Sequence, residues 1–428
     1  MTGTLRVVIT LLVFAAMLVL VLLRPRRWHE AWWTMAGAVV MLGLHLVSPG
    51  DAVAATLDGK AALLFLLALL LLSLLIGKSG FFDWAAIRCA HFADGDGRAL
   101  YRNTFVLGAL ITATLSLDTT AVILTPIVLA LVRRLRMRAL PYVVLCAFVS
   151  NVGSLLLPIS NLTNILFAVA FHLDFASFAA RMLAPQLVAL AVTYAWLRWY
   201  FRGDLPARFD PSSLPSPASA VPSHGYFVTS IVVLIMVLVG YFLAPLADVE
   251  PYVIAFGGVV VLAVAGAVTR RVRLRAAGEV SWGVFPFVVG LFVAVRAVEN
   301  LGFSPAVSAW LSRMHTGSAS KMLTTAAITA AASNVMNNLP AALLMRSILH
   351  DAQVHARPVF AALIGANAGA IVTPFGSLAT MLVMALARRD GVKVSTRSIV
   401  GLGAVLAPVL VMLTTLTAAA TFALVRSS

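Results

Sequence analysis

The chain has 428 residues, of which 61% are hydrophobic and 11% are charged, and its mean hydropathy is +0.99. Soluble domains carry about 25% charged residues, so this composition excludes a soluble protein and indicates a polytopic membrane protein. The formal net charge of +15 does not indicate nucleic-acid binding, because membrane proteins use basic loops to set their orientation.

The first apolar segment, residues 5–23, is similar to the apolar part of a signal peptide. RPRRWHE follows it in place of a small-residue cleavage site, so we expect it to remain as the first helix. Eleven further apolar segments are long enough to cross, or nearly cross, a bilayer. They fall near 31–48, 61–76, 103–132, 139–172, 179–202, 225–243, 251–268, 282–300, 319–346, 358–386 and 398–425.

The positions of lysine and arginine indicate how these segments cross the membrane. If every segment crossed once, RRLRMR at 133–138 and RPRR at 24–27 would lie on opposite sides, against the positive-inside rule. The conflict disappears if 103–132 and 319–346 are re-entrant hairpins, since most basic residues, including those of 77–102, then lie in inside loops. The sequence therefore predicts an all-α membrane protein with about ten spanning helices and two hairpins that open to opposite sides.

Residues 150–164 and 366–380 carry two copies of one unusual pattern. SNVGSLLLPISNLTN aligns without a gap with ANAGAIVTPFGSLAT, and each copy has an apolar run, a proline and a cluster of small polar residues. A proline frees a backbone carbonyl inside a helix, and the bilayer tolerates free backbone groups only where protein or a watery cavity satisfies them. We therefore expect Pro158 and Pro374 to break their helices at mid-membrane.

The two hairpins and the two broken helices, 139–172 and 358–386, occupy matching places in the two halves of the chain. Inverted repeats of this kind are typical of secondary transporters. The stretch between the halves is rich in proline and serine, as expected of a linker with little fold of its own. The predicted parts are a first inverted repeat at 1–202, a cytoplasmic linker at 203–224 and a second inverted repeat at 225–428.

Broken segments at matching positions are the best sequence indicator of a transport site. Small polar residues at the two hairpin tips and the two breaks are therefore predicted to face one cavity and bind the solute. They are Ser116, Thr119, Thr120, Asn151, Ser160, Asn161, Thr163, Asn164, Asn334, Asn337, Asn338, Asn367, Thr373, Gly376, Ser377 and Thr380.

Asp118 is the only carboxylate in the two tips and the two broken helices. Burial disfavours the charged form of a carboxylate, and intramembrane carboxylates often relay protons. We therefore predict that Asp118 binds and releases a coupling proton. The alternative is an aspartate held by backbone amides as a structural cap.

Other features of the sequence predict structure rather than chemistry. Arg296 and Glu299 are spaced to form an ion pair on one helix face, and DGDG at 94–97 is expected to be a turn. Cys89 and Cys146 stand in no motif, which predicts neither a disulfide framework nor a metal site. The chain has no HExxH, GxSxG or P-loop lysine motif, so we expect no enzyme activity and no cofactor.

Five stretches of the chain are similar to known transporters: KSGFFDWAAI (78–87), DTTAVILTPIVLA (118–130), ISNLTNILFA (159–168), SNVMNNLPAALL (333–344) and TPFGSLATML (373–382). Together they resemble the arsenite efflux permeases of the ion transporter superfamily, over nearly the whole length. At the first hairpin tip, where many of these permeases have Asn-Asp-Gly, this chain has Leu117-Asp118-Thr119. It keeps the carboxylate and lacks the amide and the glycine.

The resemblance implies a multi-pass protein of the bacterial inner (cytoplasmic) membrane. It implies export of arsenite and antimonite hydroxides in exchange for protons, by an elevator mechanism in which a transport domain moves against a scaffold. Some relatives work with a separate cytosolic ATPase subunit. The sequence leaves open whether this chain has such a partner and whether it forms a homodimer.

The residues at the two tips and the two breaks suit this substrate. As(OH)3 is neutral at physiological pH, so its site needs hydroxyl and amide groups and no basic residue.

Two other functions stay open. The same superfamily also contains sodium-coupled carriers of dicarboxylates or other anions and Na+/H+ antiporters, and half-helix N-termini favour anions. A channel or receptor-like binding protein is the other alternative, although inverted repeats with a coupling carboxylate favour a carrier.

Overall fold

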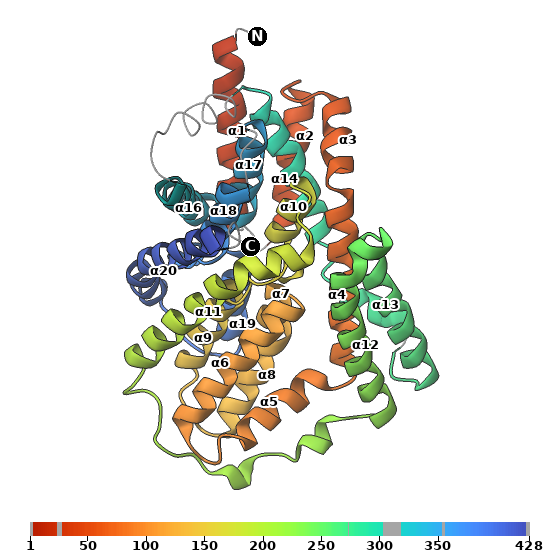
Figure 1. Cartoon of the computed structure of the whole chain (residues 1–428), viewed down its shortest axis with the longest axis vertical. Coiled ribbons are helices and arrows are strands. Elements are labelled where there is room, and N and C mark those ends of the chain that lie inside the picture. Colours follow the sequence, from red (N-terminus) through yellow and green to blue (C-terminus); the bar gives the residue numbers. More distant parts are fainter. Residues whose placement is uncertain (1–2, 24–27, 273, 303–317, 353–355, 425–428) are drawn as a thin grey trace.

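The structure is a computed structural model that describes residues 3–23, 28–272, 274–302, 318–352 and 356–424 (Figure 1). These residues are almost entirely helical and form no strand beyond an isolated bridge between Asp96 and Arg208. The prediction of an all-α membrane protein is confirmed. Among the described residues, six helices are long and apolar enough to cross a membrane: α1 (Gly3–Leu23), α4 (Lys60–Lys78), α11 (Phe175–Tyr200), α12 (His224–Leu243), α13 (Pro251–Val268) and α20 (Thr396–Leu424).

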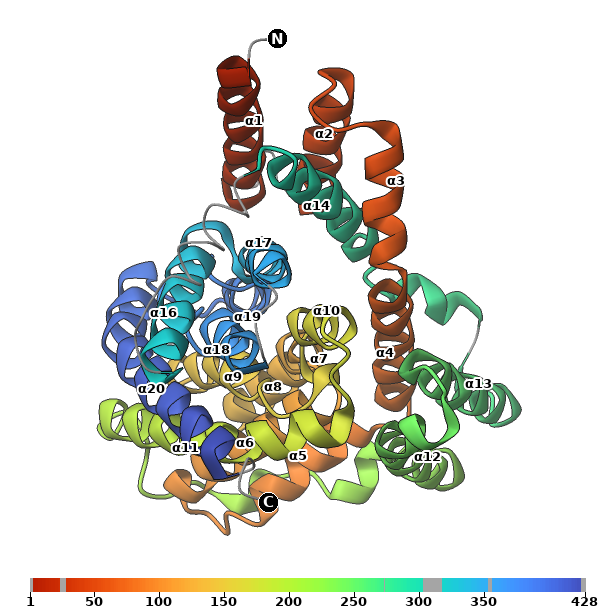
Figure 2. The same cartoon turned by 45° about the horizontal axis from the view of Figure 1, so that its top comes forward.

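The helices fall into two groups. The outer group contains α1, α4, α12 and α13 together with α2 (Glu30–Gly43), α3 (Pro49–Asp58) and α14 (Val284–Glu299). Within it, α2 packs against α1 and α14, and α13 packs against α4 and α12. Figure 2 shows this group curving round the remaining helices. Many of its large apolar side chains are exposed, for example on α1 and α13, as expected of helices that face lipid.

The inner group is built round two buried helices, α9 (Leu140–Val152) and α18 (Ala356–Asn367). Every residue of α9 from Pro141 onward, and every residue of α18 from Val359 onward, is buried. A helix that is buried on all sides needs apolar residues on all sides, and both sequences are of this kind. Around them lie α11, α20, α6 (Gly97–Thr114), α8 (Thr125–Arg134), α10 (Leu162–Ala170), α16 (Ser318–Met336), α17 (Asn338–Asp351) and α19 (Leu378–Arg389).

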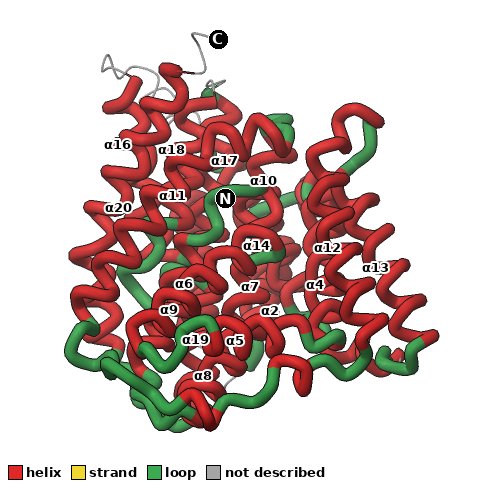
Figure 3. Tube along the Cα trace, turned by 60° about the horizontal axis from the view of Figure 1, so that its bottom comes forward, coloured by secondary structure: helices red, strands yellow, loops and turns green. Residues whose placement is uncertain are grey.

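Each segment predicted to be a hairpin forms two helices joined by a tip. The segment 103–132 lies within α6 to α8, and 319–346 lies within α16 and α17. Figure 3 shows the first pair towards one end of the molecule and the second pair towards the other. It also shows α10 above α9 but α19 below α18, so the two interrupted segments run in opposite directions.

The expectation that 77–102 is a loop was wrong, because it contains the helix α5 (Phe81–His91). Phe82, Ala85 and Ala90 of this helix are buried while Asp83 and Arg88 are exposed. This pattern is that of a short amphipathic surface helix. A search for long apolar segments misses it because its mean hydropathy is modest.

The segment 203–224 has more order than its composition predicted. It forms two short 3-10 turns, Pro211–Ser213 and Pro217–Ala220, and the second packs against α5. The Phe209 amide donates to the Gly95 carbonyl at 2.8 Å, and Arg134 Nε donates to the Ser213 carbonyl at 2.7 Å. Contacts with the inner group therefore order a segment that has little fold of its own.

Candidate functional site

The first interruption lies between α9 and α10, over residues 153–161. Pro158 begins a single 3-10 turn, Pro158–Ser160. Asn161 is extended, with φ −153° and ψ 144°, and its side chain accepts a hydrogen bond from the Thr163 amide at 3.2 Å. The amide oxygen of Asn161 thus caps the start of α10, because a helix start leaves backbone N–H groups without partners.

The second interruption, residues 368–377, repeats this arrangement between α18 and α19. Pro374 lies in its turns, and Ser377 has φ −144° and ψ 142°. The Ser377 hydroxyl accepts a hydrogen bond from the Ala379 amide at 3.2 Å. Asn161 and Ser377 align in the two copies of the sequence pattern, and they have nearly the same backbone conformation and the same capping role.

Each hairpin tip also ends in a capped helix start. Ser116 caps the helix that runs from α7 (Leu117–Thr119) through a π-helical turn (Thr120–Leu124) into α8, and its hydroxyl accepts from the Thr119 amide at 3.1 Å. Asn337 caps α17 by accepting from the Leu339 amide at 3.3 Å. Asn337 has φ +80° and ψ 152°, a strained backbone conformation that glycine adopts far more readily than other residues.

The four helix starts meet at one cavity of about 40 Å³. Its lining contains residues from both hairpin tips, both interruptions and the outer group: Leu117, Asp118, Asn161, Leu162, Asn337, Asn338, Leu339, Ser377 and Leu378, with Leu66 of α4 and Val284 and Phe287 of α14. Each helix start carries a partial positive charge. No lysine, arginine or histidine is among these lining residues, so the positive potential comes from the backbone.

Asp118 lies where this cavity meets a larger one of about 370 Å³. Its side chain is half-buried, and within the described part of the chain no hydrogen bond or ion pair engages its carboxylate. The bond that caps the tip goes to Ser116, so the alternative of a capping role for Asp118 was wrong. The polar and charged residues that line the larger cavity are Asp118, Thr119, Ser73, His29, Glu30, Glu279 and Ser281.

A buried network of amides and hydroxyls joins the two copies of the pattern behind the cavity. The side-chain oxygen of Asn367 accepts from Asn161 Nδ2 at 2.5 Å and from the Thr163 hydroxyl at 3.0 Å. Asn367 Nδ2 donates to Asn164 Oδ1 at 2.7 Å, and Asn151 Nδ2 donates to Thr380 Oγ1 at 2.9 Å. All these side chains are buried. The tertiary structure therefore brings residues 206 positions apart into direct contact.

The predicted solute-binding residues divide into two sets. Asn161, Asn337, Asn338 and Ser377 line the small cavity, and Thr119 lines the larger one. The rest bond other protein groups away from the small cavity, as when Asn334 Nδ2 donates to the Gly369 carbonyl at 2.7 Å. This second set is Ser116, Thr120, Asn151, Ser160, Thr163, Asn164, Asn334, Asn367, Thr373, Gly376 and Thr380.

The lining residues Leu66, Val284 and Phe287 were missed at the sequence level. They are apolar side chains within apolar helices, and nothing in the local sequence distinguishes them from residues that face lipid or core. Packing of α4 and α14 beside the hairpin tips brings them to the cavity.

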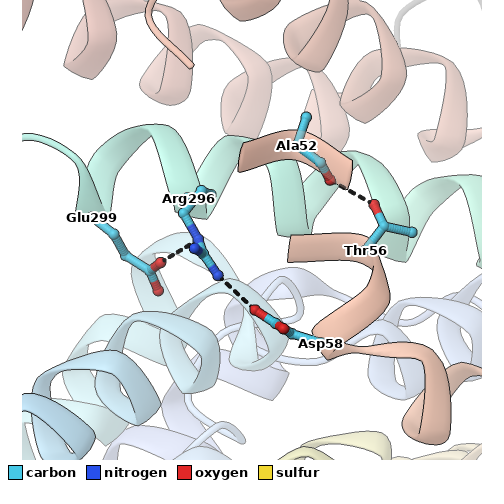
Figure 4. Close-up of polar contacts among 5 residues, drawn as sticks. All are labelled: Ala52, Thr56, Asp58, Arg296 and Glu299. Atoms are coloured by element: carbon cyan, nitrogen blue, oxygen red, sulfur yellow. Dashed lines mark hydrogen bonds and ion pairs between the residues drawn. The ribbon is translucent and has the colours of Figure 1, made fainter. Parts of the chain in front are cut away.

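A charged cluster lies away from this cavity, at one end of α14 (Figure 4). The predicted pair is confirmed, since Arg296 Nε lies 3.0 Å from Glu299 Oε2. Asp58 of α3 is a second partner, 2.9 Å from Arg296, and Glu299 also accepts a hydrogen bond from Ser347 of α17. The cluster therefore links the outer group to the second hairpin, and sequence spacing identified only its local part.

The family to which the chain belongs follows from its similarity to known proteins. The family model described as "Arsenical pump membrane protein" matches residues 8–421. The chain belongs to this family. Arsenical pump membrane proteins of Escherichia coli K12 and Yersinia enterocolitica are each 34% identical to it, over 86% of this chain and 88% of theirs. The predicted family and the predicted multi-pass inner-membrane protein are confirmed.

More distant relatives have lower sequence identity to this chain. A putative arsenical pump membrane protein of Bacillus subtilis is 22% identical over 94% of this chain and 97% of its own length. Among solved structures, the YdaH transporter of Alcanivorax borkumensis aligns with a TM-score of 0.58 and 17% identity, over 86% of this chain and 87% of that one. The second likeness concerns the fold alone.

Proposed function

We propose that this protein is a secondary active transporter that exports arsenite and antimonite hydroxides in exchange for protons. The observation that carries the proposal is the meeting on one cavity of four capped helix starts and of Asp118, whose carboxylate has no partner among the described residues. The names of the relatives as arsenical pumps support the substrate class.

The lining groups suit a neutral trihydroxide. The hydroxyls of As(OH)3 can donate to amide and carboxylate oxygens and can accept from N–H groups. Asn161, Asn337, Asn338 and Ser377 supply such groups, while none of the described lining residues is basic. A cavity of about 40 Å³ suits a solute of only a few non-hydrogen atoms.

Exchange for a proton follows from competition at Asp118. The ionised carboxylate accepts a hydrogen bond from a solute hydroxyl, whereas the protonated carboxyl has lost much of that acceptor capacity. Solute and proton therefore exclude one another at this residue. Since the solute is uncharged, its uphill export requires such coupling, with a proton entering the cell on Asp118 as the solute leaves.

An elevator mechanism is supported by the division into two groups of helices. The inner group carries the helix starts and the polar network, and the outer group would serve as the scaffold. Asp118 lines the larger cavity together with His29 and Glu279, which belong to or adjoin predicted inside loops. In the predicted topology these loops are cytoplasmic, so we assign the structure to the cytoplasm-facing state.

The proposed organisation is two inverted repeats, at 1–202 and 225–428, joined by the linker at 203–224. In total the chain would cross the membrane about ten times. Mirrored packing supports it, since α1 packs against α2 as α12 does against α13, and α2 packs against α14 as α13 does against α4. The opposite directions of the two interrupted segments (Figure 3) point the same way.

A second function is favoured by one observation. Four helix N-termini that face one cavity attract an anion as well as a neutral hydroxide. We therefore keep a sodium-coupled carrier of dicarboxylates or another anion, or a Na+/H+ antiporter, as the second candidate.

The decisive experiment measures arsenite uptake into everted membrane vesicles. A pH gradient, acid inside, and a sodium gradient are imposed separately, without ATP. We expect saturable uptake with the pH gradient alone, lost when an uncoupler is added. Uptake that requires sodium would favour the second candidate, and uptake that requires ATP and a soluble subunit would contradict secondary transport.

A further inference from the structure

The small cavity has two unlike sides. Its polar side chains, those of Asp118, Asn161, Asn337, Asn338 and Ser377, all come from the inner group. Four leucines of the inner group, Leu117, Leu162, Leu339 and Leu378, line it as well. Among the described residues, the outer group adds only apolar side chains, those of Leu66, Val284 and Phe287. We call these three residues the apolar wall. In an elevator mechanism the polar side moves with the solute, and the apolar wall stays with the scaffold.

The position of the apolar wall is set by tight packing. Gly290, one turn beyond Phe287, lies so close to α2 that a Cβ there would be 2.6 Å from the backbone carbon of Thr34. Gly59 lies similarly close to Phe292, where a Cβ would be 2.1 Å from the ring. Because α14 cannot move away from α2 and α4 without losing these contacts, Phe287 is not free to retreat from a larger solute.

The solute has two unlike sides of its own. Trivalent arsenic is pyramidal, with three hydroxyls on one side of the arsenic and its lone pair at the apex on the other. The hydroxyls match the polar side of the cavity, and the weakly hydrogen-bonding apex matches the apolar wall. A bulky apolar substituent in place of one hydroxyl would lose hydrogen bonds, and on the side of the apolar wall it would need space that this small cavity lacks.

We propose that the apolar wall, and Phe287 above all, determines specificity by limiting the size of the substituents that a trivalent arsenical can carry. Organic arsenicals in which a group much larger than a hydroxyl, such as phenyl, replaces one hydroxyl are excluded because the Phe287 ring occupies the volume that they need. This inference rests on the proposed function. It assigns to the scaffold a role in selectivity that the polar residues of the moving group cannot perform.

The test measures initial uptake rates of arsenite, methylarsonous acid and phenylarsonous acid in everted vesicles with an imposed pH gradient. Wild-type protein is compared with Phe287→Ala and with Phe285→Ala, the matched control from the same helix turn, which does not line the cavity. We expect Phe287→Ala to raise kcat/KM for phenylarsonous acid relative to arsenite by about tenfold or more, the discrimination typical of one added group. Phe285→Ala should leave this ratio unchanged. Methylarsonous acid is the small-substituent control, because methyl and hydroxyl are close in volume.

Two further variants keep the test decisive if Phe287→Ala does not accumulate in the membrane. Phe287→Leu removes less volume, and Leu66→Ala opens the same wall from α4. A ratio that is unchanged in all the wall variants, or equally changed in Phe285→Ala, would overturn the inference, as would a wild-type protein that carries the phenyl compound as fast as arsenite. Absence of arsenite transport by the wild type would instead refute the proposed function.

Discussion

The two hairpin tips present similar helix starts to one cavity but differ in how they are held. At the second tip, the Asn338 amide donates to the Gly376 carbonyl at 2.8 Å and Asn337 Nδ2 donates to the Phe375 carbonyl at 3.0 Å. At the first tip, the carboxylate of Asp118 has no hydrogen-bond or ion-pair partner among the residues that the structure describes. The second tip is thus bonded to an interruption through its capping residues. The first tip is also bonded to one, since the Ser160 hydroxyl donates to the Ala113 carbonyl at 2.8 Å, but its capping turn keeps a titratable group free to react. A nearly symmetric backbone therefore supports asymmetric chemistry.

The largest expected effect comes from removing that asymmetry. Asp118→Asn should abolish proton-driven arsenite uptake, because an amide cannot take up and release the proton. The double variant Asp118→Asn with Asn338→Asp moves the carboxylate to the second tip, and we expect no rescue. Vesicle uptake, with membrane content checked by immunoblot, measures both. Normal uptake by Asp118→Asn would show that the proton is carried elsewhere.

The next largest effect should come from the buried network that joins the halves. Asn367→Ala leaves Asn161, Thr163 and Asn164 each short of a hydrogen-bond partner, and a buried polar group without its partner costs about 1–3 kcal/mol. We expect a clear fall in the melting temperature of the detergent-solubilised protein. Asn300→Ala, which removes one hydrogen bond to Asp51 at 3.3 Å, is the control and should have little effect.

A smaller effect should distinguish the two interruption caps. Ser377→Ala and Asn161→Ala each remove a helix cap, worth about 1 kcal/mol. Asn161→Ala should destabilise the protein more, since it also removes the bond to Asn367. Thermal unfolding of the two variants and of the double variant with Asn367→Ala measures the difference. Equal destabilisation by the two cap variants would mean that the cross-half bond adds nothing.

The smallest effect concerns a cap outside the membrane. Asp96 caps α6, and hydrogen bonds from the Ala99 and Arg98 amides lower its pKa. A lowered pKa means that the carboxylate stabilises the fold above its unfolded-state pKa and loses this contribution as the pH falls through the folded-state pKa. The melting-temperature difference between wild type and Asp96→Ala should therefore shrink in acid. The neutral caps Asn161 and Ser377 should show no such trend, and a difference that is independent of pH would contradict this reading.

Local signals in the chain were enough to identify the membrane protein, its family and the two interruptions. The apolar composition indicates that most of the chain is surrounded by lipid. A proline followed by small polar residues indicates where a helix loses its own hydrogen bonds. Asn161 and Ser377 were found in this way because capping depends on neighbours two residues away. The same signals missed α5, whose amphipathic pattern is too short to stand out.

Packing alone decided which polar residues face the solute cavity and which lie behind it. Asn161 lines the cavity and Asn367 does not, although both belong to the same repeated pattern. The apolar wall of Leu66, Val284 and Phe287 also emerged only in three dimensions. The physical reason is that hydropathy and spacing describe a residue's own helix, whereas a cavity forms from side chains of segments that are distant in the sequence and meet only when the helices pack.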